Sequence, residues 1–260
     1  MTVTLPTILL ASVLNIHGMA LSLHYEDQSQ GMVFETMVEE IKRLGASDVS
    51  LVVQWSQKNT RANAIGPHRK ESPTDAVVSR VARKAKSVGL RVTIFPILWV
   101  EQRAMGEWRG TLAPTNPEAW WAAYKKFIMH YARFAEEEGA YALSIGSELA
   151  SMEHHRTRWV RLIRSVRKVF GGKLIYSANW DHYEPVSFWD EVDFAGLTGY
   201  YRLSEKHDAT VSELMAAWRR IRSNLLTWQR RIAKPFIFTE LGYPSLDGAA
   251  IDPWNYSANG

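Results

Sequence analysis

The stretch Ala140-Tyr-Ala-Leu-Ser-Ile-Gly-Ser-Glu148 is a short apolar run that ends in an acidic residue just before a loop. The stretch Lys234-Pro-Phe-Ile-Phe-Thr-Glu240 repeats this pattern near the end of the chain. Short runs that are apolar on both faces are typical of parallel strands. A carboxylate at the carboxyl end of such a strand points into the mouth of a (β/α) barrel, where active sites are built. The two stretches therefore predict a barrel with Glu148 and Glu240 at its mouth.

Strand-like and helical runs alternate along the rest of the chain. The expected strands are residues 19–24, 49–55, 90–98, 141–146, 174–178, 194–198 and 236–239, and the expected helices are residues 33–44, 75–88, 117–138, 157–170 and 210–232. Such alternation predicts an α/β fold whose parallel sheet is built by right-handed crossovers. Because the expected strands end in polar or aromatic residues, we predict a TIM-type (β/α)8 barrel rather than an open sheet.

The eighth strand of this barrel has no candidate in the sequence. Only 20 residues follow Glu240, and they are rich in Gly, Pro, Asp and Asn. The apolar run at 5–16 is separated from the first expected strand by His17 and Gly18 alone, whereas a parallel crossover needs a dozen or more residues. We therefore expect the eighth strand to be missing or irregular.

The chain divides into an apolar lead-in at 1–17 and one barrel domain at 18–260. The length of 260 residues fits a single barrel. The lead-in is too short to span a bilayer, and it lacks the positive flank of a secretory signal. Two interpretations remain open, a segment that packs under the domain and a trimmed or degenerate export signal.

The composition excludes several classes of protein. Hydrophobic residues make up 46% of the chain and charged residues 22%, which indicates a large core and a well solvated surface. The net charge of +4 comes from basic residues interspersed with 27 acidic ones, so no basic stripe marks a nucleic-acid partner. The absence of cysteine excludes a disulfide framework and a thiolate zinc site.

The histidines do not form a metal motif. Glu153, His154 and His155 are consecutive, and neighbouring residues at the start of a helix point in different directions. Zinc sites need ligands at convergent spacing, such as i and i+4. We therefore expect no metal and no cofactor.

Polar and aromatic residues gather at the ends of the expected strands and just after them. The eleven Trp and ten Tyr residues of the chain offer flat faces to sugar rings, although most large aromatic residues belong to the core. Alternation along the strand points one of Tyr200 and Tyr201 inward and the other outward, and each Trp candidate fits the core as well as the cleft. The candidates for substrate binding are His24, Gln54, Trp55, Trp99, Asn179, Trp180, Tyr200 and Tyr201. Together they suit a neutral polyhydroxylated ligand better than a phosphorylated metabolite.

An ordered set of motifs is similar to glycoside hydrolase family 113, which is known for β-1,4-mannanases. The motifs are Trp108-Arg-Gly110, Ile145-Gly-Ser-Glu-Leu149, Tyr176-Ser-Ala-Asn-Trp180, Phe188-Trp-Asp190 and Phe238-Thr-Glu-Leu-Gly-Tyr243, within a similarity that runs from about Gly31 to Trp254. The resemblance implies a retaining (β/α)8 glycosidase with catalytic Glu residues on strands four and seven. On this resemblance Glu148 matches the acid/base and Glu240 the nucleophile.

Retaining hydrolysis needs these two groups on physical grounds as well. One carboxylic acid protonates the leaving oxygen while the other carboxylate attacks the anomeric carbon, at a separation of about 5–5.5 Å. Their environments must differ, because one is protonated near neutral pH and the other ionised. Tyr200 or Tyr201 can donate a hydrogen bond to Glu240, and Asn179 can reach a ring hydroxyl or Glu148.

The leading hypothesis is a retaining glycoside hydrolase that cleaves a β-linked polysaccharide, either mannan-like or from the cell envelope, by double displacement. The alternative is a non-catalytic glycan-binding or envelope-biogenesis protein on a degenerate glycosidase barrel. A phosphate-binding metabolic barrel would need a Gly-rich loop near its last two strands, and none is visible. We expect a monomer whose partner is an oligo- or polysaccharide. A polymeric substrate favours a secreted or periplasmic location over a cytoplasmic one.

Overall fold

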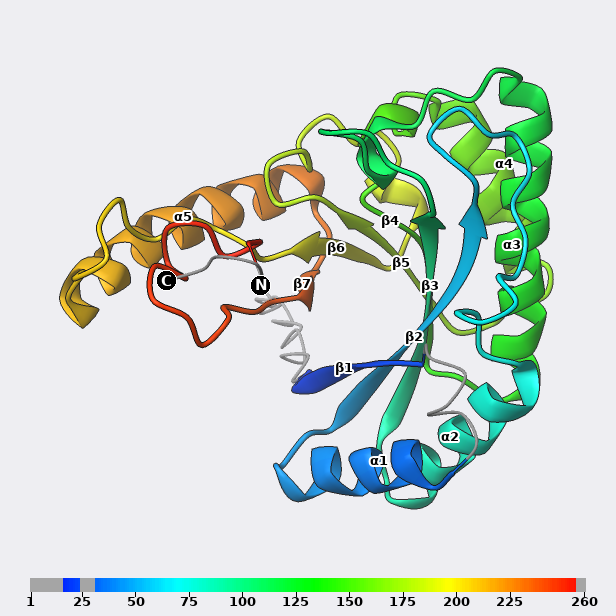
Figure 1. Ribbon diagram of the computed structural model, residues 1–260, viewed down its shortest axis with the longest axis horizontal. Helices are drawn as coiled ribbons and strands as arrows, with labels where there is room; N and C mark the ends of the chain where they lie inside the picture. The colour runs from blue at the N-terminus through cyan, green and yellow to red at the C-terminus, as the bar shows by residue number, and fades with distance from the viewer. Residues whose placement is uncertain (1–15, 24–30, 256–260) are drawn as a thin grey trace, which may run out of the picture.

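The computed structural model describes residues 16–23 and 31–255 (Figure 1). Its centre is one seven-stranded parallel sheet whose strands follow each other in chain order. The strands are β1 (Gly18–Ser22), β2 (Asp48–Gln57), β3 (Arg91–Val100), β4 (Ala142–Ser147), β5 (Lys173–Ala178), β6 (Phe194–Thr198) and β7 (Phe236–Glu240). These bounds agree with the expected strands to within a few residues.

Five helices connect the strands and cover the convex face of the sheet (Figure 1). They are α1 (Val33–Arg43), α2 (Asp75–Ser87), α3 (Pro117–Glu137), α4 (Arg156–Arg167) and α5 (Val211–Ile232). Between β5 and β6 the crossover contains only a short 3-10 turn, Trp189–Glu191. The α/β fold with parallel strands is confirmed.

The sheet curls but does not close. β1 and β7 lie at its two ends and pair with one neighbour each, so the strands form a curled half-barrel. An eighth strand is not seen among the described residues. Most of the predicted lead-in, residues 1–15, lies outside the described residues, as do residues 24–30. None of the helices within 31–255 combines the length and apolar character that crossing a bilayer requires.

Local sequence signals explain where the helices begin. Pro117 opens α3 after Asn116, whose side chain accepts a hydrogen bond from the amide of Ala119 at 3.1 Å. Thr210 and Glu213 form a capping box at the start of α5. Such caps satisfy backbone groups that have no partner within the helix.

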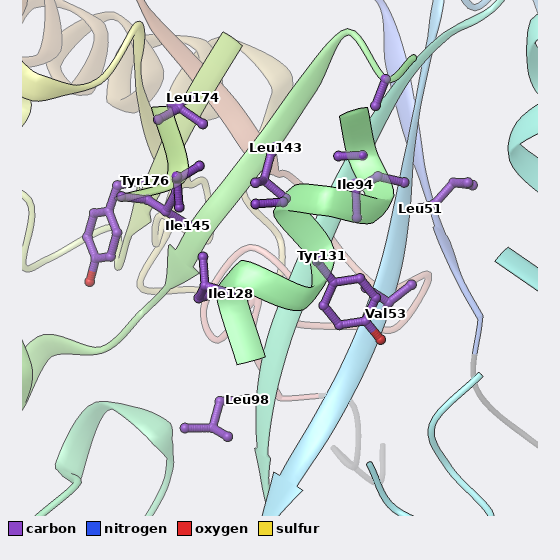
Figure 2. Packing of buried hydrophobic residues seen from close by; sticks show 14 of the residues in the cluster. Leu51, Val53, Ile94, Leu98, Ile128, Tyr131, Leu143, Ile145, Leu174 and Tyr176 are labelled. Atoms are coloured by element: carbon purple, nitrogen blue, oxygen red, sulfur yellow. The ribbon is translucent and has the colours of Figure 1, made fainter. Parts of the chain in front are cut away.

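The main core lies between the sheet and the helices outside it. Figure 2 shows Ile128 and Tyr131 of α3 beside Val53, Ile94 and Leu143 on neighbouring strands, and all five are at most 1% exposed. Burying one such aliphatic side chain contributes about 1.5–3 kcal/mol. This outer core holds the strands in place from the convex side.

The concave side is packed much less fully. Its buried cluster consists of Ala142, Ile175 and Phe194, with Tyr141 and Ile237 against them. These residues line a cavity of about 950 Å³ that opens between the two edge strands. A closed barrel fills its interior with layers of side chains. The described residues leave this space open, and every residue of β7 is half-buried.

β4 has no spare room where it approaches the helices. The hydroxyl of Tyr124 donates to the carbonyl oxygen of Ile145 at 2.8 Å. A Cβ atom on Gly146 would lie 2.8 Å from that hydroxyl and 3.1 Å from the ring of Trp159. The close packing of helix side chains on β4 therefore requires glycine at 146.

We expect Gly146→Ala to lower the free energy of unfolding by about 1–3 kcal/mol, because the new methyl group overpacks a buried contact. Denaturant unfolding followed by tryptophan fluorescence measures this change. Gly66→Ala is the matched control, since nothing lies within 4 Å of the added Cβ there. Its effect should stay within about 0.5 kcal/mol. Equal stability of the two variants would contradict this account of β4.

Candidate active site

A cavity of about 420 Å³ lies at the carboxyl ends of β4 to β7. We call it the carboxylate cavity, because both predicted catalytic residues line it. Its walls are Trp108, Arg109, Glu148, Asn179, Trp180, Tyr200, Glu240 and Trp254. The larger cavity inside the half-barrel is mainly apolar, and it lies toward the amino ends of β1 to β6 and along β7 as far as Glu240. Only the carboxylate cavity is lined by both Glu148 and Glu240, so it is the candidate for chemistry.

Both acidic residues follow an irregularity in the strand pairing. The register between β4 and β5 shifts between Ser144 and Ser147, and that between β6 and β7 shifts after Leu197. Such bulges re-aim side chains and occur often beside active sites. The irregularity between β4 and β5 lies just before Glu148, and the one between β6 and β7 lies beside Glu240.

Glu148 adopts an unusual backbone conformation. Its φ of 54° lies in the left-handed region, which costs a non-glycine residue about 1–3 kcal/mol. Its amide donates to the carbonyl oxygen of Ser177 at 2.7 Å, which ties the turn to β5. The Glu148 side chain is 8% exposed. A strained conformation held by neighbouring strands is typical of functional positions.

Arg109 forms an ion pair with Glu148. The guanidinium Nη2 lies 2.5 Å from the Glu148 Oε2, and both side chains are largely buried. Arg109 comes from the loop after β3, at the start of the short 3-10 turn Arg109–Thr111. Its charge also opposes the rise in the pKa of Glu240. One cation thus compensates two neighbouring carboxylates.

Glu240 lies half-buried at the end of β7. Burial and the negative charge of Glu148 raise the pKa of Glu240, while Arg109 and a hydrogen bond from Tyr200 oppose the rise. The Tyr200 hydroxyl donates to Glu240 Oε2 at 3.2 Å. The other oxygen, Oε1, is buried without a hydrogen-bond partner in the described part of the chain. It is therefore available to a reacting atom.

Aromatic faces complete the cavity. The rings of Trp180 and Trp254 stack at 5.6 Å with an angle of 12° between their planes. Asn179 is held in place on both sides, because its Oδ1 accepts from Thr198 at 3.2 Å and its Nδ2 donates to Asp181 at 2.6 Å. This amide is fixed at the rim before any ligand binds.

The structure brings most of the predicted site residues together. Asn179, Trp180 and Tyr200 line the carboxylate cavity with the two Glu residues. Gln54 and Trp99 line a neighbouring cavity of about 190 Å³, and Trp108 and Arg109 belong to the walls of both. The prediction for His24 falls outside the described residues.

The structure places two of the predicted substrate-binding residues away from the carboxylate cavity. Trp55 is 8% exposed and stacks on Phe127 of α3 at 5.3 Å, because its side chain points to the convex face of the sheet. Tyr201 is 7% exposed and packs edge-on against Trp218 and Phe238. Neither residue lines either cavity at the strand ends. Alternation thus turns Tyr200 inward and Tyr201 into the core.

Three wall residues were not among the predicted site residues. Trp108 and Arg109 come from a loop, and Trp254 comes from the irregular segment after β7. The motif Trp108-Arg-Gly110 is the feature of the sequence that could have identified Trp108 and Arg109 as site residues. Nothing in the local sequence marks Trp254, because its position depends on how the final segment folds back.

No group of three or more acidic or histidine side chains within 16–23 and 31–255 is arranged to hold a metal ion. His154 and His155 stack on each other at 3.8 Å instead of converging on one point.

The family model of Glycoside Hydrolase Family 113 matches residues 24–260. The chain belongs to this family. The match covers the strands that carry Glu148 and Glu240, and it confirms the resemblance shown by the sequence motifs. The protein is thus a β-mannanase-like glycoside hydrolase of family 113. No curated protein matches the chain.

Solved structures of the same family share the fold. The GH113 β-mannanase AaManA from Alicyclobacillus acidocaldarius, in complex with ManMIm, is 25% identical with a TM-score of 0.83, over 94% of this chain and 76% of AaManA. Two structures of GH113 β-1,4-mannanases have TM-scores of 0.82 and 0.83 at 21% and 22% identity. Each of these alignments covers 94% of this chain and 78% of the relative.

The raised pKa of Glu240 has a consequence for stability. A group whose pKa is raised by folding stabilises the native state below its unfolded pKa, and this stability is lost as the pH rises through the folded pKa. We expect Glu240→Gln to raise the free energy of unfolding by about 1 kcal/mol at pH 8. The gain should vanish near pH 4, where the wild-type carboxyl is protonated in both states.

Thermal unfolding at the two pH values measures this difference. Glu205→Gln is the control, because the Glu205 side chain is 83% exposed. A Glu240→Gln variant that is less stable than the wild type at pH 8 would contradict the unfavourable burial of this carboxylate.

Proposed function

We propose that the protein is a retaining endo-acting glycoside hydrolase that cleaves a β-linked, mannan-like polysaccharide. The observation that carries the proposal is the pair of carboxylates, Glu148 and Glu240, that line one aromatic-walled cavity at the ends of β4 and β7. Glu148 is close enough for its charge to raise the pKa of Glu240. Two carboxyl groups in one sugar-sized space are the machinery of glycosidic cleavage.

In the first step Glu240 is the nucleophile. One of its oxygens attacks the anomeric carbon and forms an ester bond, while the bond from that carbon to the leaving oxygen breaks. Glu148 gives its proton to the leaving oxygen, so that an alcohol departs. Tyr200 holds Glu240 in place and stabilises its ionised form.

In the second step Glu148 is the base. It takes a proton from a water molecule, whose oxygen attacks the anomeric carbon and releases Glu240 as a carboxylate. Arg109 suits this half of the cycle, because its ion pair with Glu148 stabilises the carboxylate that results from the first step. Glu148 must leave this ion pair when it donates its proton.

The cavity walls fit neutral sugars. The indole faces of Trp180 and Trp254 can cover the apolar face of a pyranose, and Asn179 offers a fixed amide beside the carboxylates. The adjoining cavity with Gln54 and Trp99 gives room for further sugar units, which suits a polymer and cleavage within its chain. The β-mannanase names of the similar structures point to mannan as the first substrate to test.

The ion pair of Arg109 and Glu148 favours one other candidate, a glycan-binding protein without turnover. A carboxylate that stays paired with a guanidinium does not donate a proton. The two candidates share the ligand class and differ in turnover.

We expect both Glu148→Gln and Glu240→Gln to lower kcat/KM on β-1,4-linked mannan oligosaccharides by about 10²–10⁴-fold, because each loses a proton-transfer or bond-forming group. With an aryl β-mannoside that has an activated leaving group, Glu148→Gln should lose much less, since that leaving group needs no proton. The anomeric configuration of the first product should be retained.

The control for this pair is Glu184→Gln, because Glu184 is an exposed partner of Arg231. Wild-type binding of mannan oligosaccharides without turnover would support the glycan-binding candidate. Full activity of Glu240→Gln, or an inverted product, would remove the proposed mechanism.

The pH profile tests the role of Tyr200. Its hydrogen bond lowers the pKa of Glu240, so Tyr200→Phe should raise that pKa further and move the acidic limb of kcat/KM to higher pH. Activity is then lost earlier as the pH falls, because the nucleophile must be ionised. Tyr201→Phe is the matched control from the buried neighbour. An acidic limb that moves equally in both variants would contradict this assignment.

A further inference from the structure

A second buried carboxylate lies behind the candidate active site and outside the carboxylate cavity. Glu153 is 1% exposed, although it belongs to the short loop between β4 and α4. Its Oε1 accepts a hydrogen bond from the Tyr176 hydroxyl at 2.6 Å, and its Oε2 lies 2.7 Å from His182 Nδ1. The mechanism proposed above makes no use of this group.

Burying the carboxylate of Glu153 costs free energy. Burial raises the pKa of Glu153, and the hydrogen bonds from Tyr176 and His182 oppose the rise. The charge of Glu148 raises it further, so the two acids are near neighbours. A hydrophobic residue at such a position would often be as stable as a buried ion pair. Stability alone is therefore a weak explanation for the carboxylate.

On one side, Glu153 acts on the turn that carries Glu148. The Tyr176 hydroxyl accepts a hydrogen bond from the Leu149 amide at 3.3 Å while it donates to Glu153. Tyr176 is completely buried, with its ring 4.9 Å from that of Phe188. Leu149, which follows the left-handed Glu148, is thus held by the Tyr176 hydroxyl. The position of that hydroxyl depends in turn on Glu153.

On the other side, Glu153 holds the loop after β5. His182 lies in this loop, and its amide donates to the carbonyl oxygen of Asn179 at 3.0 Å. Asn179 and Trp180 line the carboxylate cavity just before it. The contact between His182 and Glu153 joins this wall of the cavity to the loop after β4 through side chains, in addition to the backbone hydrogen bond from Glu148 to Ser177.

We propose that Glu153 is a positioning residue that joins the Glu148 turn to the Asn179–Trp180 wall through Tyr176 and His182. The inference rests on the proposed function for its catalytic meaning. The physical coupling itself is independent of turnover, because it concerns two segments that share one buried carboxylate. Loosening either end should therefore loosen the other.

Hydrogen exchange measured by mass spectrometry on the whole chain tests the coupling without any substrate. His182→Ala removes the outer end of the network, and no hydrogen bond joins His182 to Glu148 or Leu149 in the described structure. We expect exchange in 147–153 to rise about tenfold in this variant, together with exchange in 179–184. Tyr176→Phe should raise exchange in 147–153 by a similar factor.

Two further variants separate positioning from general destabilisation. Glu153→Gln keeps an acceptor for Tyr176 and a donor for the His182 ring, so both segments should stay close to the wild type, whereas Glu153→Ala should release both. Glu138→Gln is the matched control, because Glu138 is a buried carboxylate paired with Arg83 at the end of α3. It should leave 147–153 and 179–184 unchanged.

Kinetics on mannan oligosaccharides supply the second measurement. Tyr176→Phe should lower kcat about tenfold with little change in KM, because it disturbs the acid/base turn. His182→Ala should raise KM more than it lowers kcat, because it frees the binding wall. A structural role alone would lower kcat through the folded fraction in both variants and leave KM unchanged.

The failures of the two proposals are distinguishable. Absence of turnover by the wild type counts against the proposed function. The exchange experiment would still test the coupling, because it uses no substrate. Unchanged exchange in 147–153 for both His182→Ala and Tyr176→Phe would overturn the coupling, whatever the activity. An equal rise in every segment of the protein would overturn it as well.

Discussion

Two carboxylates that line one cavity repel each other, and the structure around them is organised to hold both. The repulsion and the loss of solvation raise the pKa of Glu240, while Arg109 and Tyr200 oppose the rise. The sheet holds the two carboxylates against the repulsion that remains, because each Glu lies at the end of a strand that is paired with a neighbouring strand. The site therefore depends on strand ends that cannot move apart to relieve the repulsion.

The half-barrel is most closely packed around β4, the strand that leads to Glu148. β4 is buried along its whole length, with Tyr124 and Trp159 closely packed around Gly146. β7 is half-buried at every position and borders the large unfilled cavity. The strand that carries the left-handed Glu148 is thus the most firmly held, and the strand that carries Glu240 lies at the open edge of the sheet.

Sequence patterns predicted the strands and helices well, because each is a local feature with a clear start or stop. The position of Glu148 and Glu240 at one cavity was predictable for the same reason, since each lies at the carboxyl end of a strand-like run. The orientation of Trp55 was not predictable, because it depends on α3 covering that face of β2. The choice between Tyr200 and Tyr201 likewise needed the contact with Trp218. Arg109 and Trp254 reach the cavity from loops, whose paths follow from tertiary contacts rather than periodicity.

The central claim is that Glu240 forms a covalent bond with the sugar while Glu148 moves the proton. An activated 2-deoxy-2-fluoro β-mannosyl reagent, which reacts with a retaining enzyme and releases its sugar slowly, tests this claim most directly. After proteolysis and mass spectrometry, the account predicts one added fluorosugar on the peptide that contains Glu240, and none in Glu240→Gln. A label on Glu148 or on any other carboxylate would contradict it.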